Sequence, residues 1–260
     1  MRNSLNRGVM WGAGAMAILV LALTAYAFLD GDDGSGDGKS EASPSATASG
    51  KPAPTYTTPE DWTEPERWVA LPSGERTDDS GNETGFPRTT EGAVAMLKAT
   101  STVEVSRERS AVEEQLGLYN SYMVRADRSA ANAEKVERDA ADLDKSLHRQ
   151  MGVDAADPMP SGAYMRTYVV GYQVIEESDG EVSAWLLCRT TLKTGETKKE
   201  TASYSRNLLA AVWEGGDWKL SSAATVRASE QTAGKTRPEM VAPGDAEFNS
   251  AGWTAIREAS

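Results

Sequence analysis

The sequence has a single cysteine, Cys188, and a single histidine, His148. One cysteine cannot form a disulfide within the chain, so the fold must be stabilised by its core. Cys188 ends the apolar run 184–188, which predicts a small buried hydrophobe rather than a reactive thiol. His148 lies among Lys145, Arg149 and Gln150, where we expect a solvated residue at a helix end.

With one histidine, no Ser–His–Asp or Cys–His set can be proposed, and His/Cys spacings typical of metal sites are absent. The Gly-rich stretch 31–38 is acidic and lacks the Lys-Ser/Thr of a phosphate-binding loop. The sequence therefore predicts no catalytic residues, no cofactor and no metal.

Positive charge is scarce as well, because 27 Lys and Arg face 39 Asp and Glu, giving a formal net charge of −12 at pH 7. An acidic surface is repelled by nucleic-acid phosphates and by anionic lipids. We therefore expect no direct binding to nucleic acid, and we expect the acidity mainly to confer solubility.

The sequence does contain one long apolar run, residues 8–29, which includes no charged side chain. A helix over this run would rise about 33 Å at ~1.5 Å per residue, enough to cross a ~30 Å hydrocarbon core. Arg2 and Arg7 precede the run and aspartates follow it, which predicts that residues 1–7 are cytoplasmic. The sequence thus predicts a single-pass plasma-membrane protein with an extracytoplasmic C-terminal domain.

A cleaved secretory signal is the alternative interpretation of the same run. Ala25-Tyr26-Ala27 is an A-x-A-like cleavage site behind a basic N-terminal region, although the run exceeds the ~7–15 apolar residues of a usual signal. Both interpretations place the rest of the chain outside the cytoplasm.

Residues 30–60 are mostly Gly, Ser, Pro, Thr, Ala and Asp, a composition typical of a disordered linker. An apolar arm and loop follow at 61–87, and a largely polar tail occupies 227–260, flexible to about Glu239 and ending in a short docking segment. The large apolar side chains of arm and tail pack on the domain or dock a partner. These candidate docking residues are Trp62, Trp68, Leu71, Phe248 and Trp253.

Three helices are predicted before residue 152. The first covers about 90–103, and the second starts at a Ser110–Glu113 capping box. The third covers about 128–151 and stops at Gly152, which suits a left-handed C-terminal position.

From Tyr164 the apolar period changes to two, which predicts strands over 164–177, 181–193, 197–214 and 217–226. Gly171 in the first of these suggests a bulge or bend. The predicted fold class is α+β: a transmembrane helix, then three helices packed on a bent four-stranded antiparallel sheet.

Three helices followed by a bent meander resemble the nuclear transport factor 2-like cone over residues 88–226. With an anchor and a linker, the layout resembles the inner-membrane scaffold subunit of type IV secretion machines. The segments 66–74 (ERWVALPSG), 90–93 (TEGA) and 243–245 (PGD) look like an uncharacterised actinobacterial family associated with integrative conjugative elements. That family has no established catalytic residues. The resemblance implies a non-catalytic scaffold whose partners are other membrane or envelope proteins of a transfer complex, with self-association as an option.

Two alternatives stay open at this stage. Some cone-fold enzymes use an Asp base with Tyr donors in the concave pocket, and four tyrosines could face such a pocket or simply fill the core. These candidate pocket residues are Tyr119, Tyr122, Tyr168 and Tyr172. A similar anchor-plus-domain layout occurs in accessory proteins of actinobacterial lipid importers.

Overall fold

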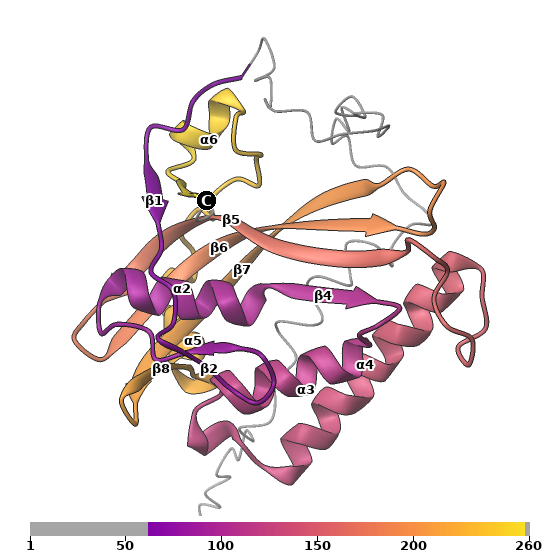
Figure 1. Cartoon of the computed structure of the whole chain (residues 1–260). Helices are drawn as coiled ribbons and strands as arrows, with labels where there is room; N and C mark the ends of the chain where they lie inside the picture. Colours follow the sequence, from indigo (N-terminus) through magenta and orange to yellow (C-terminus); the bar gives the residue numbers. More distant parts are fainter. Residues whose placement is uncertain (1–61, 258–260) are drawn as a thin grey trace, which may run out of the picture.

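The computed structural model describes residues 62–257, which form an α+β fold with a mostly antiparallel sheet (Figure 1). The helices are α2 (Thr90–Ser101), α3 (Ala111–Tyr122), the 3₁₀ helix η1 (Arg125–Asp127), α4 (Ala130–Met151), α5 (Ser222–Thr232) and α6 (Ala246–Ser250). The strands are β1 (Trp68–Ala70), β2 (Arg76–Thr77), β3 (Glu83–Thr84), β4 (Val103–Ser106), β5 (Tyr164–Glu177), β6 (Glu181–Lys193), β7 (Thr201–Glu214), β8 (Asp217–Leu220) and β9 (Thr254–Arg257). The predicted transmembrane helix (8–29) and the whole predicted linker (30–60) lie outside the described residues, and no helix within 62–257 has the length and hydropathy of a membrane span.

The three predicted helices are confirmed, and local chemistry accounts for their ends. Thr89 caps α2 by accepting from the Gly92 amide, and Ser110 caps α3 through the predicted capping box with Glu113. Helix α4 ends at Gly152, whose φ of 73° is left-handed.

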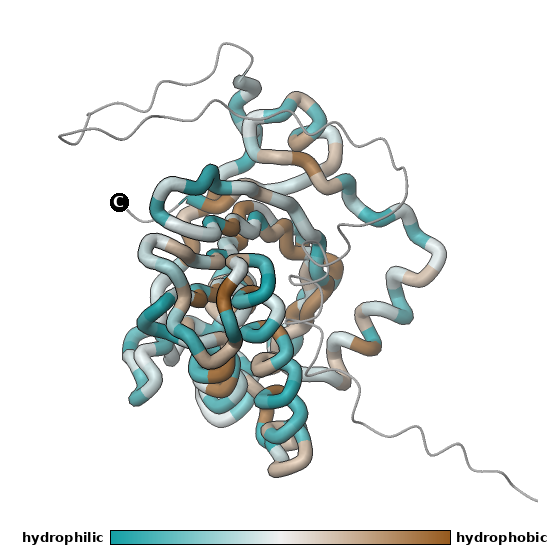
Figure 2. Tube along the Cα trace, turned by 90° about the vertical axis from the view of Figure 1, so that its right-hand side faces the viewer, coloured by the Kyte–Doolittle hydropathy of each residue, from teal (hydrophilic) through white to brown (hydrophobic). Residues whose placement is uncertain are grey.

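Three long strands, β5 to β7, and the short strand β8 form the predicted antiparallel meander. Figure 1 shows β5, β6 and β7 crossing over α2, with α3 and α4 packed together below. The pairing of β5 with β6 shifts register between Val169 and Gly171, which confirms the predicted irregularity at Gly171. Figure 2 shows the apolar stretches gathered inside the curved sheet and the hydrophilic loops outside it.

The prediction of a four-stranded sheet is wrong, because the main sheet has seven strands in the order β1-β9-β5-β6-β7-β8, with β4 pairing with β5. Strand β4 pairs with the first half of β5, and β9 pairs with β5 at Gly171 and Tyr172. Strand β1 joins β9 in parallel, although nearly the whole domain separates them in sequence. Strands of three or four residues carry too little period-two pattern to be found before their partners are known.

The predicted strand over 217–226 is also wrong beyond Leu220. Ser221 accepts from the Ala224 amide and starts α5, which takes up residues expected in the strand and in the flexible stretch. The small side chains of Ala224 and Ala228 are buried and let α5 pack on β7.

The sheet has a packed cluster on each face. The inner cluster lies between the sheet and α2, α3 and α4, and it includes Met96, Leu97, Leu186 and Trp218. The outer cluster contains Leu187, Phe248, Trp253 and Ala255, with half-buried partners such as Trp68 and Trp185. The arm and the tail are thus part of the folded domain.

Candidate functional site

The four candidate pocket tyrosines do not converge on one site. Tyr119 donates to the Asp127 carbonyl at 3.1 Å and accepts from the Ser129 amide at 2.9 Å. Tyr122 donates to the Glu83 carbonyl at 2.8 Å, and Tyr172 packs in the inner cluster.

Tyr168, in contrast, lies on the opposite face of the sheet. It is paired with Arg189 of β6, and it alternates along β5 with the buried inner residues Thr167 and Val169. Three of the four tyrosines therefore belong to the interior, and the fourth belongs to the outer face.

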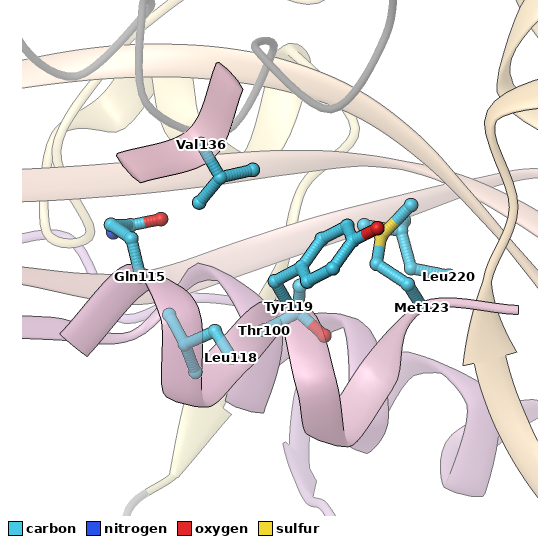
Figure 3. A pocket seen from close by; sticks show the side chains of 7 residues that line it. All are labelled: Thr100, Gln115, Leu118, Tyr119, Met123, Val136 and Leu220. Carbon is cyan, nitrogen blue, oxygen red and sulfur yellow. The ribbon is translucent and has the colours of Figure 1, made fainter. Parts of the chain in front are cut away.

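A small cavity of about 20 Å³ lies between α2, α3, α4 and β8 (Figure 3). Its lining is apolar apart from two neutral polar side chains and the Tyr119 hydroxyl, and it includes no carboxylate. A space of this size holds about one water molecule, so no organic ligand fits in this conformation. The lining residues are Thr100, Gln115, Leu118, Tyr119, Met123, Val136 and Leu220.

The five candidate docking residues contact the chain itself. Phe248 and Trp253 are buried on the outer face, and the Trp253 indole donates to the Glu239 carbonyl at 2.7 Å. Trp68 and Trp62 donate to the Glu64 carboxylate at 2.7 and 2.9 Å, while Leu71 packs against the inner cluster. Docking to a separate partner stays a prediction for these residues, and their present contacts hold the arm and tail in place.

A polar network ties the β2–β3 hairpin to α3 and β8. Ser121 donates to Asp78 and accepts from the Asn82 amide group at 2.9 Å. Lys219 donates to the Ser121 carbonyl at 2.9 Å and to the buried Asp217 carboxylate at 3.1 Å. The hydrogen-bonding groups of this network are thus paired with one another, which indicates that the network attaches the β2–β3 hairpin to α3 and β8.

Asp78 makes this network sensitive to acid. Burial tends to raise its pKa, but hydrogen bonds from Ser121, Asn82 and Ser80 outweigh burial and hold the pKa below its ordinary value. A depressed pKa adds stability above the ordinary Asp pKa, and that stability is lost as pH falls through the folded-state pKa. We expect Asp78→Asn to destabilise the fold near pH 7, with the deficit narrowing in acid. Urea titrations of both chains from pH 7 to pH 3 measure this, and a deficit independent of pH would contradict it.

Cys188 and His148 are engaged in structural contacts. Burial raises the pKa of the Cys188 thiol to about 12, which suits the predicted inert hydrophobe. The His148 ring nitrogens lie 2.7 Å from the Asp144 carbonyl and 2.9 Å from the Asp157 carbonyl. His148 therefore joins α4 to the loop after it. Within residues 62–257, no three His, Cys, Asp or Glu side chains group as a metal site would require.

The exposed half of the outer face carries a pattern that the sequence reasoning missed. Tyr168, Arg189 and Tyr204 lie side by side across β5, β6 and β7. All three are half-buried, so each is open to solvent on one side. The signal was present as alternating Tyr and Arg in strands, Tyr-x-Arg-x-Tyr over 164–168 and Tyr-x-Arg over 204–206. We call the set the Tyr–Arg face: Tyr164, Arg166, Tyr168, Arg189, Tyr204 and Arg206.

Contacts within the Tyr–Arg face orient its side chains. The Arg166 guanidinium lies 4.3 Å from the Tyr164 ring centre and donates twice to Glu104, at 2.9 and 3.1 Å. Tyr164 donates to Glu200, which also lies 3.8 Å from Arg189. These contacts with neighbours at the strand ends restrict the orientations of the Tyr164 and Arg166 side chains.

An open polar groove lies at the other end of the sheet, but its groups already pair with each other. Arg88 donates to the Asp179 carbonyl at 3.0 Å, and Thr90 donates to the Glu177 carboxylate at 2.8 Å. Of the two surfaces, the Tyr–Arg face is therefore the better candidate for binding.

Comparison with known proteins gives no match to a family model, to a curated protein or to a solved structure.

Proposed function

We propose that the chain is a membrane-anchored, extracytoplasmic scaffold subunit that works through protein contacts and not by catalysis. The single observation that carries the proposal is the Tyr–Arg face. Tyrosine and arginine are the residue types enriched among the residues that dominate binding energy at protein interfaces. The small size of the cavity beside Tyr119 supports the same choice over a pocket enzyme, because it has room for about one water molecule.

In the finer proposal, the domain is a nuclear transport factor 2-like cone in a conjugative, type IV secretion-like apparatus. The curled meander over α2, α3 and α4 is compatible with that cone. The charge-free run at 8–29 and the three segments that resemble the conjugative-element family support the setting.

Arg189 is the arginine of the Tyr–Arg face that has no close carboxylate or carbonyl partner within the described residues. Its side chain is 39% exposed, the Glu200 carboxylate lies at a solvent-screened 3.8 Å, and it also forms a hydrogen bond with Tyr204. A carboxylate on a partner protein could form a bidentate pair of hydrogen bonds with the Arg189 guanidinium, shorter than the 3.8 Å contact with Glu200. The flanking Tyr168 and Tyr204 rings would bury apolar area around that contact.

The test is capture of envelope partners by the full chain in its native cells, followed by mass spectrometry. We expect Arg189→Glu to reduce recovery of transfer-apparatus proteins about tenfold or more, because charge reversal at an interface centre is costly. Arg138→Glu is the matched control, because Arg138 lies on α4 with its side chain 67% exposed. Equal recovery by both variants, or recovery of no membrane or envelope subunit by the parent chain, would overturn the proposal.

The membrane setting has a separate test. A reporter fused to the C-terminus is expected outside the cytoplasm, and a cytosolic reporter would contradict the anchor orientation. The genes beside this one distinguish conjugation ATPases from importer subunits, and importer neighbours would favour the lipid-transport accessory instead.

A further inference from the structure

Strand β7 has an open edge over most of its length. Strand β8 pairs with β7 over residues 211–214, and Ser221 and Thr225 take the carbonyl and amide of Ala210. The backbone amide and carbonyl of one residue point to the same side of a strand, and this side alternates from one residue to the next. Because the amide and carbonyl of Ala210 point away from β6, those of the other even-numbered residues of β7 do so as well. Ala202, Tyr204, Arg206 and Leu208 have no backbone partner on that side within the described chain.

This edge lacks the usual protection against strand pairing. Natural sheets blunt an open edge with Lys, Pro, a bulge or a covering segment. The run 201–208 (TASYSRNL) has no Pro and no Lys, and its single charged side chain, Arg206, lies over Trp185 on the outer face and donates to the Pro238 carbonyl. Its pairing with β6 is regular, without a register shift. The edge is thus free of bulges, nearly uncharged and seven residues long from Ala202 to Leu208.

A second, independent feature lies on the inner side of the same strand. The Ser205 hydroxyl and the Asn207 side-chain oxygen are buried and have no hydrogen-bond partner within the described residues. Buried polar atoms without a partner are costly, and of the six such atoms among the described residues these two lie on the strand with the open edge.

We propose that two copies of the chain pair antiparallel along this edge, with the two-fold axis at Ser205, to make one continuous sheet. The inference rests on the proposed function as a scaffold and gives it a self-association surface. Pairing on this axis sets Tyr204 opposite the partner's Arg206, and Ala202 opposite the partner's Leu208. Each of these pairs exchanges two backbone hydrogen bonds, so the whole open edge is used.

Side-chain complementarity selects this register. An axis at Arg206 would set two guanidinium groups opposite each other, which is unfavourable. An axis at Asn207 would require Ala210, whose backbone is already bonded to α5 and its cap. The Ser205 axis instead sets the two Ser205 hydroxyls opposite each other, and Asn207 opposite the partner's Ser203. The two Ser205 hydroxyls can then hydrogen-bond to each other, one donating and one accepting, and the Asn207 oxygen gains a donor in the partner's Ser203 hydroxyl.

A cysteine scan of the full chain tests the axis. The background is Cys188→Ala, because Cys188 is paired with Ser205 in the sheet and could form a disulfide with a new cysteine. Ser205→Cys would place two thiols in a facing, non-hydrogen-bonded pair with Cα atoms ~4.5 Å apart, within disulfide reach. Ser203→Cys is the control, since its two copies would lie about 14 Å apart along the strands.

We expect mild oxidation to cross-link Ser205→Cys at least tenfold more than Ser203→Cys, with circular dichroism showing both chains folded. Cross-linking at 203 equal to that at 205, or none at 205 in a folded chain, would overturn the proposal.

Two further variants test the pairing along the edge without introducing a cysteine. Tyr204→Lys would face the partner's Arg206 and is expected to weaken dimerisation about tenfold relative to Tyr204→Glu, which would face it with opposite charge. Sedimentation of the full chain in detergent measures this, and equal dimerisation would count against the register.

The outcomes separate this inference from the proposed function. A chain that captures envelope partners through Arg189 but stays monomeric and uncross-linked would refute the dimer alone. A chain that dimerises through Ser205 but captures no envelope subunit would refute the proposed function alone.

Discussion

Replacing Gly92 by alanine is expected to destabilise the fold by about 3 kcal/mol, the upper end of typical overpacking costs. A Cβ at this position would lie 1.9 Å from the Pro87 carbonyl oxygen, far inside contact distance. That oxygen cannot move away, because it accepts from the Trp218 indole at 2.9 Å and from the Thr89 amide at 2.8 Å. Equilibrium urea denaturation measures the loss.

Gly117→Ala is the matched control on α3, with the opposite sign expected. Its Cβ would meet atoms of Ser80 and Asn82 no closer than 3.5 Å, which is ordinary contact. Alanine favours a helix over glycine by up to ~1 kcal/mol, so this variant should gain stability. Two glycine-to-alanine changes within helices thus differ by about 4 kcal/mol in expectation. A shift of the same sign in both would contradict the clash at Pro87.

Phe248→Ala is the second large effect, with an expected loss of ~3–5 kcal/mol. The Phe248 ring is fully buried and packs where Gly171 leaves room, since a Cβ on Gly171 would lie 3.2 Å from it. The damage should spread along the sheet edge, because β9 follows α6 and is the link between β5 and β1. Hydrogen exchange should therefore quicken in β1 as well as in β9.

Met240→Ala controls for truncation elsewhere in the tail. Met240 is 52% exposed, so its loss should change stability by less than ~0.5 kcal/mol. If β1 exchanged as slowly in Phe248→Ala as in the parent chain, the arm would be held by contacts other than the tail.

Interactions close in sequence were predictable. The Ser110–Glu113 capping box and the stop at Gly152 each depend on a few neighbouring residues, and both occur as expected. The buried state of Cys188 followed from an apolar run of five residues.

The candidate site was less predictable, because its members come from separate strands. Tyr168 is a predicted pocket residue that lies instead on the outer face, since the sequence of one strand does not say which of its faces is covered. The row with Arg189 and Tyr204 exists through the register of β5, β6 and β7. A one-residue slip would send all three side chains to the other face.

By itself, the sequence determined the α+β class, the three helices, the capping box of α3 and the Gly152 stop of α4, and the long strands β5 to β7. Tertiary structure alone decided that the arm and tail join the sheet as β1 and β9, that the cavity beside Tyr119 measures about 20 Å³, and that β7 keeps an open edge. The physical reason is the distance along the sequence over which each interaction acts. Caps, turns and periodic burial act over a few residues, whereas pairing Trp68 with Ala255 depends on loop closure across the whole domain.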